Sequence, residues 1–505
     1  MRVTLIEAGD LSKTKAWRLP PDAYSNRVSS ITNASQEFLR GIGAWSYVDE
    51  TRTGPVEEMQ VWDGVSDARI TFSASDMTSN GRPLGELSRL TENLNLQRAL
   101  LRYLESSPGV ELVDKVKVES ITNDDREGNS WPVVHLSDGR VIRARLLVGA
   151  DGFNSPVRTY AGIQSYGWAY DTHGVVATLV HAPRSPYGPQ NTVAYQRFLP
   201  TGPIAFLPLS DTASTMVWST KPHIASALKS VDPAVLVGMV NAAFRLPEVS
   251  MRYLHERLLE AHASGTSITL QQLQDEVRFR EMSHSIDSNS ALSSLSALGE
   301  PGIPPEGAES YPPLVKSIQP GTVASFPLRF SHADTYIGEG QGSRTVLIGD
   351  AAHTTHPLAG QGLNLGLADA EALAHCIHDS LSRGGDIGSY TSLMSYSRAR
   401  YFENHKMLAA VDKLHKLYST TADPVVWARS VGLEVLNELD TLKAAFMVSA
   451  GSHQVKSTPG QLGVGIAAQG LEALARGIND AKNAGELVSG VLQSGLRQLF
   501  RSSPR

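Results

Sequence analysis

The sequence predicts an α/β fold in which the segments of an open parallel sheet are interleaved with an antiparallel sheet. Three observations carry this prediction. Short apolar strands are followed by an acidic residue at Glu7, Asp151 and Asp350, as expected at the carboxyl edge of a parallel sheet. Between the last two, residues 172–220 alternate apolar and polar side chains, as half-buried antiparallel strands do. After Asp350, helical spacing continues to about Leu417.

The composition is that of a globular protein without a transmembrane helix. A chain of 505 residues exceeds what one core usually supports, and no apolar stretch approaches the roughly 18 residues of a membrane span. The net charge of -6 and the lack of a basic stripe argue against nucleic acid as a partner. The single cysteine, Cys376, excludes an internal disulfide framework and fits a reducing compartment.

The first strand, residues 1–7, ends in Glu7. A dinucleotide fold places such an acid about 20 residues after a GxGxxG loop, where it binds ribose hydroxyls. Here the strand begins at residue 2, so the expected domain lacks its first strand and glycine-rich loop. Because surface acids at strand ends are common, a purely structural Glu7 remains an alternative.

Two arginines lie near predicted helices. Residues 24–43 are expected to form a turn and a helix capped by Ser25 or Asn26, with Arg27 near its start, where it reaches a pyrophosphate or stays solvated. Residues 86–105 have an apolar helical stripe, flanked by Arg98. This arginine, together with Asn93, is a ligand candidate, and an ordinary exposed helix face is the alternative.

A predicted hairpin, residues 133–149, leads directly to an Asp-Gly motif. Its two arms are joined by Asp138-Gly139, which suits a two-residue turn. The second arm then runs into Asp151 and Gly152, with Ser155 and Arg158 at fixed offsets. A single Asp-Gly pair after a strand is an ordinary turn, and a ligand site is the alternative.

The segment from Val346 to Ala370 joins a buried strand, a carboxylate, a glycine-rich loop and a helix. Glycines permit close backbone approach, and a helix amino terminus offers unpaired amide donors, so this order predicts a ligand cradle. The alternative is a turn in which Asp350 only caps the helix. The residues that form the predicted cradle are Gly349, Asp350, Gly360, Gln361, Gly362, Leu363 and Asn364.

Two loop histidines, His353 and His356, lie between this carboxylate and the glycines. Their spacing provides no recognisable third or fourth ligand, so no metal site is expected. Together with Pro357 they are candidates for the wall of a pocket. No residue can be assigned from the sequence as a catalytic acid or base.

In this order the motifs resemble those of the aromatic-ring flavin monooxygenases, the family that contains p-hydroxybenzoate hydroxylase. The chain looks most like the ubiquinone-biosynthesis ring hydroxylases of the eukaryotic mitochondrial type. The resemblance extends to about residue 445 and includes four further stretches, namely YSNRVSSI at 24–31, MQVWD at 59–63, FLPTGPIAFLPLSD at 198–211 and FPLRFSHADTY at 326–336.

The resemblance implies a Rossmann-like FAD-binding domain interleaved with an antiparallel substrate domain, followed by carboxyl-terminal helices. It implies that FAD binds to the predicted cradle and to Glu7, Arg27, Arg98, Asp151 and Gly152. Asp350 would accept a hydrogen bond from a ribityl hydroxyl, and the helix after Gly362 would stabilise the anionic reduced flavin.

The implied activity is hydroxylation of the aromatic ring of a polyprenylated hydroxybenzoate-type intermediate through a flavin hydroperoxide. Implied partners are this apolar phenol, molecular oxygen, a ferredoxin-type electron donor and other ubiquinone-biosynthesis proteins. The implied location is the matrix side of the mitochondrial inner membrane, with peripheral membrane contact. Rival hypotheses are another phenolic-ring flavin hydroxylase of the same fold, and a truncated, flavin-poor scaffold protein without activity.

The expected domain organisation follows the motifs. The FAD-binding domain takes residues 1–165 and 336–385. The antiparallel domain takes residues 166–335, with a Ser/Pro-rich surface insertion without regular structure at about 283–320. A helical region is expected at 386–450, and a low-complexity amphipathic tail at 451–505.

Overall fold

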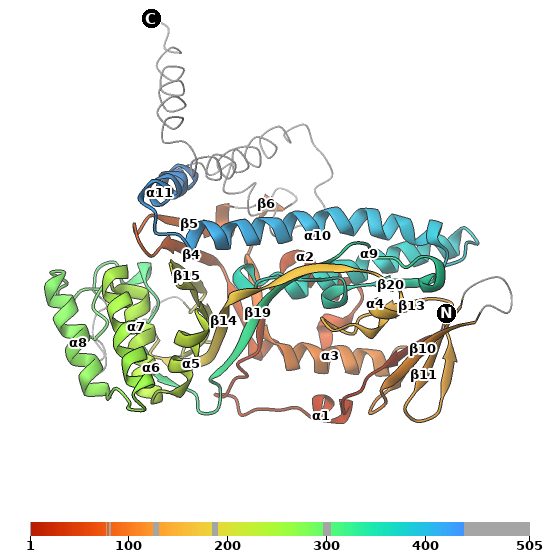
Figure 1. The fold of residues 1–505 in the computed structure, drawn as a ribbon, viewed down its shortest axis with the longest axis horizontal. Coiled ribbons are helices and arrows are strands. Elements are labelled where there is room, and N and C mark those ends of the chain that lie inside the picture. Colours follow the sequence, from red (N-terminus) through yellow and green to blue (C-terminus); the bar gives the residue numbers. More distant parts are fainter. Residues whose placement is uncertain are drawn as a thin grey trace, which may run out of the picture.

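The computed structural model describes residues 2–76, 78–79, 82–124, 131–183, 190–295 and 305–438. In Figure 1 the molecule is elongated, with the helices α5 to α8 at one end and the strands β10 and β11 at the other. The long helix α10 (Tyr390–Tyr418) runs along one side between these ends. The predicted tail at 451–505 lies outside the described residues.

Among the described residues, two pairs of parallel strands lie outside the central sheet. Strand β1 (Val3–Ile6) pairs with β9 (Val110–Val113), and β13 (Leu147–Gly149) pairs with β20 (Thr345–Leu347). Helix α3 (Asn93–Glu105) precedes β9 in the chain. These pairs, the antiparallel sheet and the helices confirm the predicted α/β class.

Several boundaries differ from the sequence prediction. The predicted helix at 24–43 begins with a strand, β2 (Val28–Thr32), and α2 (Asn33–Gly41) is capped by Thr32, not by Ser25 or Asn26. The predicted helix at 86–105 likewise begins with β8 (Ser88–Glu92). Both β2 and β3 (Thr53–Val56) pair with β8. Hydrogen bonding between strands therefore overrides helical propensity at both places.

The second arm of the predicted hairpin at 133–149 is not one continuous strand but consists of the two strands β12 and β13. Strand β12 (Val141–Arg143) pairs with β11 (Trp131–Leu136), which also pairs with β10 (Val118–Asp124). The chain then leaves this meander, and β13 joins the parallel pair with β20. The arm therefore connects two sheets.

A nine-stranded mixed sheet forms the centre of the molecule. Its long strand β14 (Ser165–His181) is antiparallel to its neighbours, whereas β15 (Val193–Leu199) runs parallel to β4 (Glu58–Asp63). The first part of the chain thus extends the predicted antiparallel sheet. The other strands are β5 (Arg69–Ser73), β16 (Gly202–Pro208), β17 (Ala213–Thr220), β18 (Val315–Ile318), β19 (Ala324–Ala333) and β21 (His353–Thr354).

Four helices that the sequence analysis did not predict pack with this sheet. A continuous core joins sheet residues such as Phe206 and Trp218 to Val240 and Phe244 of helix α6. These helices lie together at one end of the molecule (Figure 1). They are α5 (Pro222–Ser230), α6 (Pro233–Arg245), α7 (Glu248–Ala263) and α8 (Leu270–Ser283).

The expected surface insertion at 283–320 is wrong for its described second half. Strand β18 lies in this segment and pairs with β14, and Val315 is buried. Before it, Ser293 and Ser294 are also buried and donate hydrogen bonds to the Glu281 carboxylate. A high content of serine and proline did not prevent packing here.

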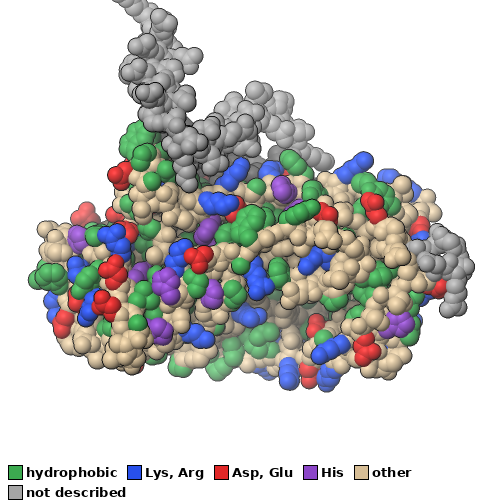
Figure 2. Space-filling view, in the orientation of Figure 1, with side chains coloured by type: hydrophobic (Ala, Val, Ile, Leu, Met, Phe, Trp, Pro, Cys, Tyr) green, Lys and Arg blue, Asp and Glu red, His purple; other side chains and the backbone are tan. Residues whose placement is uncertain are grey.

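The carboxyl-terminal helices cover the parallel pair and the sheet. Helix α9 (Gly362–Ser382) packs along α10. Helix α11 (Asp423–Glu438) is fixed to β4 by a buried ion pair, in which the Arg429 guanidinium donates to both Asp63 carboxylate oxygens at 2.8 and 2.9 Å. Among the described residues no helix is long and apolar enough to cross a bilayer. Figure 2 shows charged side chains of both signs scattered over this face of the molecule, without a single basic patch.

Candidate functional site

The two acid-and-glycine motifs meet at one edge of the parallel pair β13–β20. Because these strands run in the same direction and in register, Asp151 and Asp350 follow neighbouring strand ends. The Ile348 amide donates to the Gly149 carbonyl at 3.0 Å, which continues the pairing to the start of both motifs. Ligands of open α/β sheets bind at this edge.

The Asp151 carboxylate has a structural role in the first motif. It accepts a hydrogen bond from the Val157 amide at 3.0 Å, and Ser155 caps the short helix α4 (Pro156–Tyr160). Gly152 has a positive φ of 82° and open space around it. A ligand contact of Asp151 and Gly152 stays a prediction.

Arg158 bridges the two motifs. Its guanidinium donates to the Ala351 carbonyl at 2.7 Å and to the Phe153 carbonyl at 2.7 Å. Sequence analysis noted Arg158 as part of a motif but did not include it among the site residues. Its role depends on a contact across 193 positions of the chain, which spacing alone does not reveal.

Replacement Arg158→Lys is expected to loosen this bridge. A lysine keeps the charge but lacks the planar fork that reaches two carbonyls. We expect a loss of about 1–3 kcal/mol, the usual cost of leaving a buried polar group unpaired. Urea unfolding of both proteins measures it, and an unchanged midpoint would show that the bridge is dispensable.

The Gly349-Asp350 turn presents an unpaired carboxylate. Gly349 has a φ of 58°, and its Cα lies close to that of Gly366, where an added Cβ would approach it to 3.3 Å. Solvent reaches Asp350, and no described residue forms a hydrogen bond with it. Surrounding protein nevertheless desolvates it enough to raise its pKa, against the influence of His353. Such a carboxylate can accept a hydrogen bond from a hydroxyl group of a ligand.

The predicted cradle continues with an uncapped helix end. Gly360 has a φ of 60°, and Gln361 at the amino cap of α9 supplies no side-chain hydrogen bond to the first turn. The first amides of the helix, at Gly362 and Leu363, therefore stay available as donors. An anionic or polar group fits at this position.

The side chain of Asn364 holds the cradle in place. It is buried and accepts from the Thr32 amide at 3.0 Å, while its own amide group donates to the Ser30 carbonyl at 2.7 Å. These bonds fix the start of α9 to strand β2. The contacts support a positioning role for this side chain, and the predicted flavin contact is untested.

A buried ionic network lies behind the Gly349 turn. Asp369 accepts from the Gly349 amide at 3.0 Å, is bonded to His353 Nε2 at 2.6 Å, and accepts from Arg400 Nε at 2.8 Å. Burial opposes ionisation of Asp369, but His353 and Arg400 outweigh it and lower its pKa. The Asn404 amide group donates to the same carboxylate.

Sequence analysis missed this network, although one signal was present. Asp369 follows Leu365 and precedes Leu373 by one helical turn each, so an acid interrupts an apolar stripe. His353 was predicted as a pocket residue. The structure buries it and pairs it with Asp369, which supports a positioning role.

His356 is also fully buried. Its Nδ1 accepts the Leu358 amide hydrogen bond at 3.1 Å, and its Nε2 has no partner among the described residues. Burial lowers the pKa of His356 to about 3, helped by His415, so the ring is neutral. Pro357 begins the turn that leads to the cradle. Among the described residues no group of His, Cys, Asp and Glu is arranged to hold a metal.

The same network reaches His332. The Tyr336 hydroxyl accepts from Asn404 and lies 3.2 Å from His332 Nε2. Burial lowers the pKa of His332 to about 4, and the neighbouring His405 and His353 act in the same direction. The tautomer of the neutral ring determines whether His332 Nε2 donates or accepts in the hydrogen bond with Tyr336.

Stability is therefore expected to depend on His332 in mild acid. An unfolded histidine protonates near pH 6.5, so between that pH and about 4 the unfolded state binds more protons and stability falls. In His332→Gln the loss between neutral pH and pH 5 should be smaller by roughly 1–2 kcal/mol. Urea midpoints at both pH values measure this, and His378→Gln, at an exposed position, should retain the full loss.

Three other residues predicted to bind the cofactor lie apart, in the contacts observed, from Asp350 and the start of α9. Glu7 follows β1, is exposed, and accepts from the Gly9 amide at 2.6 Å. Arg27 is exposed, with its carbonyl bonded to the amide of Asn93. Arg98 is buried against Trp17 and beside Asp49. Their roles toward a cofactor stay predictions.

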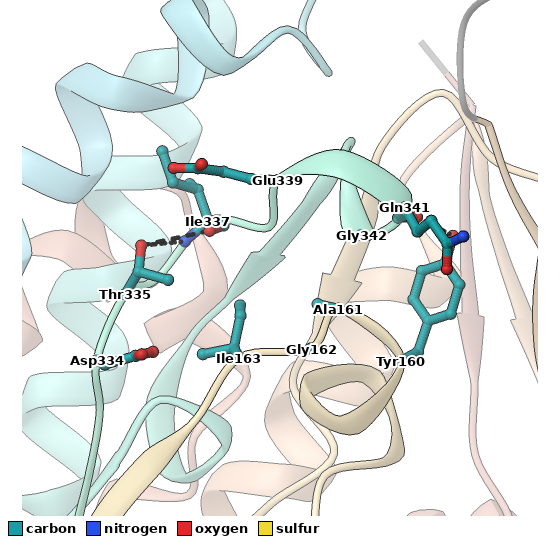
Figure 3. Close-up of a pocket in the computed structure, with 10 residues that line it drawn as sticks. All are labelled: Tyr160, Ala161, Gly162, Ile163, Asp334, Thr335, Ile337, Glu339, Gln341 and Gly342. Atoms are coloured by element: carbon teal, nitrogen blue, oxygen red, sulfur yellow. Dashed lines mark hydrogen bonds between the residues drawn. The ribbon is translucent and has the colours of Figure 1, made fainter.

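One cavity of the molecule lies at the opposite end of β20. Its wall includes Gly342, which precedes the strand, whereas Asp350 follows it. Figure 3 shows the cavity between the end of α4 and the loop from Asp334 to Gly342, with the Tyr160 side chain beside Gln341. This position separates it from the predicted cradle.

Comparison with known proteins identifies the class. A model of the FAD binding domain matches residues 22–265 and 320–408. Solved structures with the same fold include p-nitrophenol 4-monooxygenase PnpA from Pseudomonas putida, with a TM-score of 0.57, 16% identity and coverage of 90% of this chain and 93% of that chain. Another is a variant of Klebsiella pneumoniae HpxO complexed with FAD. Its TM-score is 0.55 and its sequence identity is 15%, with coverage of 89% of this chain and 99% of that chain. The fold and the matched domain are those of FAD-dependent monooxygenases.

Curated relatives identify the family. Each is named ubiquinone biosynthesis monooxygenase COQ6, mitochondrial. The Xenopus tropicalis protein is 38% identical over 454 residues, covering 89% of this chain and 87% of the relative. The Saccharomyces cerevisiae protein is 35% identical over 463 residues, covering 90% and 88%, and the human protein is 36% identical over 456, covering 89% and 86%. The chain belongs to this COQ6 family, whose cofactor is FAD.

The observed cluster fits FAD. The cofactor carries hydroxyl groups along its ribityl chain and anionic character on its reduced ring system. The unpaired Asp350 carboxylate suits the hydroxyls, and the uncapped amino end of α9 suits the anion. Gly360 and Gly362 leave the backbone open on this side, since an added Cβ would contact only Ser30 or Thr355 at 3.6 and 3.8 Å.

Proposed function

We propose that this protein hydroxylates the aromatic ring of a polyprenylated hydroxybenzoate-type intermediate of ubiquinone biosynthesis. The observation that carries the proposal is the match to COQ6 monooxygenases at 33–38% identity, over 85–90% of the chain. The cradle at Asp350 and α9 supports it, because the Asp350 carboxylate has no hydrogen-bond partner among the described residues and the first turn of α9 has no side-chain cap. When bound, FAD supplies the redox and oxygen chemistry.

The residues of this chain would bind and orient the cofactor. Asp350 would hold the ribityl chain, and the amides of Gly362 and Leu363 would face the ring system. Glu7 would bind the adenosine ribose, and Arg27 would approach the pyrophosphate. Behind them, Asp369 and Arg158 fix the two turns, so that little reorganisation accompanies binding.

The nine-stranded sheet would cover the substrate and exclude water. Pro357 and the buried His356 lie at the start of the turn to the cradle, so they would define the pocket wall beside the reacting ring. Neutral His356 offers one unpaired nitrogen, which would hold a proton near the substrate hydroxyl. No residue is assigned as the catalytic base.

The proposed setting is the matrix face of the mitochondrial inner membrane, because the curated relatives are named mitochondrial and a polyprenylated phenol resides in lipid. The proposed partners are a ferredoxin-type electron donor, molecular oxygen and other ubiquinone-biosynthesis proteins.

Product analysis tests the proposal. The purified full chain, incubated with FAD and given a ferredoxin, its reductase and oxygen, is expected to hydroxylate a short-chain prenyl hydroxybenzoate. p-Nitrophenol, the substrate named for PnpA, serves as the matched alternative. Hydroxylation of p-nitrophenol alone would instead favour another phenolic-ring hydroxylase. Bound flavin with no product from either phenol would overturn the proposed function.

A further inference from the structure

A second cavity, of about 390 Å³, is lined mainly by arginines. Its volume lies within the range of small-molecule sites. The lining comes from the segment after α1 (Leu11–Lys15), from the turns before β3, and from the outer part of α3. The lining residues are Trp17, Arg18, Leu19, Tyr47, Asp49, Arg52, Arg98 and Arg102.

Two of the four guanidinium groups have carboxylate partners. The Arg52 guanidinium donates to Glu92 at 2.7 Å, and it also donates to the Pro20 and Ala23 carbonyls. Arg98 lies 3.7 Å from the Asp49 carboxylate. These two groups form the inner wall, and Glu92 is itself fully buried.

The other two, Arg18 and Arg102, have no carboxylate partner among the described residues. Arg18 is exposed and Arg102 is half-buried, so they form the outer part of the cavity. Because Asp49 is the one acidic residue of the lining, the cavity has an excess of positive charge. Helical neighbours of like charge, such as Arg98 and Arg102 one turn apart, repel each other.

The surroundings of Arg98 are unfavourable for its positive charge. It is 6% exposed, its Nε has no hydrogen-bond partner, and it is fixed by bonds to the Trp17 carbonyl and the Asn95 side chain. Burial lowers its pKa, and the charges of Arg102, Arg18 and Arg52 lower it further. A bound anion would relieve this repulsion.

We propose that this cavity is an anion site for a small molecule that bears a phosphate group, separate from the flavin cradle, and that Arg98 serves this site and not the predicted contact with FAD. Guanidinium groups bind phosphate oxygens through paired hydrogen bonds, and several of them converge in a concave wall here. The exposed ring of Tyr47 in the lining offers surface to a base or another flat group, whereas the Trp17 ring lies against the Arg52 and Arg98 guanidinium groups. Hydrogen bonds and strand pairing tie the cradle to β2, β13 and β20, whereas this cavity is built on the middle and outer turns of α3.

Phosphate binding to the FAD-loaded full chain tests the proposal. Isothermal titration at low salt with inorganic pyrophosphate is expected to show saturable binding with a Kd below about 1 mM. Arg18→Gln with Arg102→Gln should weaken it by about tenfold or more, with retained flavin absorbance and thermal midpoint. Arg278→Gln is the matched control, because Arg278 is exposed on α8, far from the lining in the chain.

A second titration with AMP distinguishes two sources of the anion. Tighter binding of AMP than of pyrophosphate would indicate a nucleotide whose base contacts the aromatic lining, and equal binding would indicate recognition of the phosphate group alone. Either result supports the site. Pyrophosphate that binds only to the FAD-free protein, or binds equally to the double variant, would overturn it.

Discussion

Replacement Asp369→Ala is expected to reduce stability by about 3–5 kcal/mol, the usual cost of breaking a buried ion pair by removal of one charge. Asp369 is fully buried and joins the Gly349 amide, His353 and Arg400. Without it the Arg400 guanidinium, itself 4% exposed, loses its carboxylate. The urea unfolding midpoint is the measurement, with flavin retention as a second readout.

A double replacement allows this prediction to be tested even if the single variant does not fold. In Asp369→Leu with Arg400→Met both charges leave together, and apolar side chains of similar size often substitute for a buried ion pair at little cost. The double variant should therefore be more stable than Asp369→Ala. A single variant with an unchanged midpoint would show that the carboxylate is not needed to balance Arg400.

Replacement Asp350→Ala is expected to separate cofactor binding from folding. The carboxylate has no hydrogen-bond partner among the described residues, so its removal should leave the unfolding midpoint of the FAD-free protein nearly unchanged. A charge-assisted hydrogen bond contributes about 1.5–3 kcal/mol, so FAD affinity should fall by roughly tenfold to a hundredfold. Fluorescence titration of FAD measures this.

Asp151→Ala is the matched comparison, because its carboxylate accepts the Val157 amide in α4. It should lower the unfolding midpoint more than Asp350→Ala does. Equal FAD affinity in wild type and Asp350→Ala would contradict the assignment of this carboxylate to the ribityl chain.

The sequence was sufficient for features that are local. Apolar strands followed by Asp151 and Asp350 predicted strands of a parallel sheet, and the structure pairs β13 with β20 in parallel. Helical spacing after Gly362 correctly predicted α9 and α10. Each of these signals lies within one element and its adjoining turn, so the pattern of apolar and polar residues is enough to recognise it.

The missed features depend on distant contacts or on burial from all sides. Helix α6 is buried on nearly every face, so it has no polar stripe to reveal its period. Asp369 interrupted an apolar stripe, but its partner Arg400 lies 31 positions further along the chain. Likewise, nothing local in Arg158 indicates that it reaches the Ala351 carbonyl.

The bridge made by Arg158 has a consequence for biosynthesis of the protein. The motif at Asp151 is synthesised long before the motif at Asp350, since the contact that joins them spans 193 positions that include most of the central sheet. Contacts of such separation form late in folding, because the loop between them must close first. A nascent chain released before Arg400 would lack the support of the Gly349 turn. Uptake of FAD is therefore expected only after helix α10 has been synthesised.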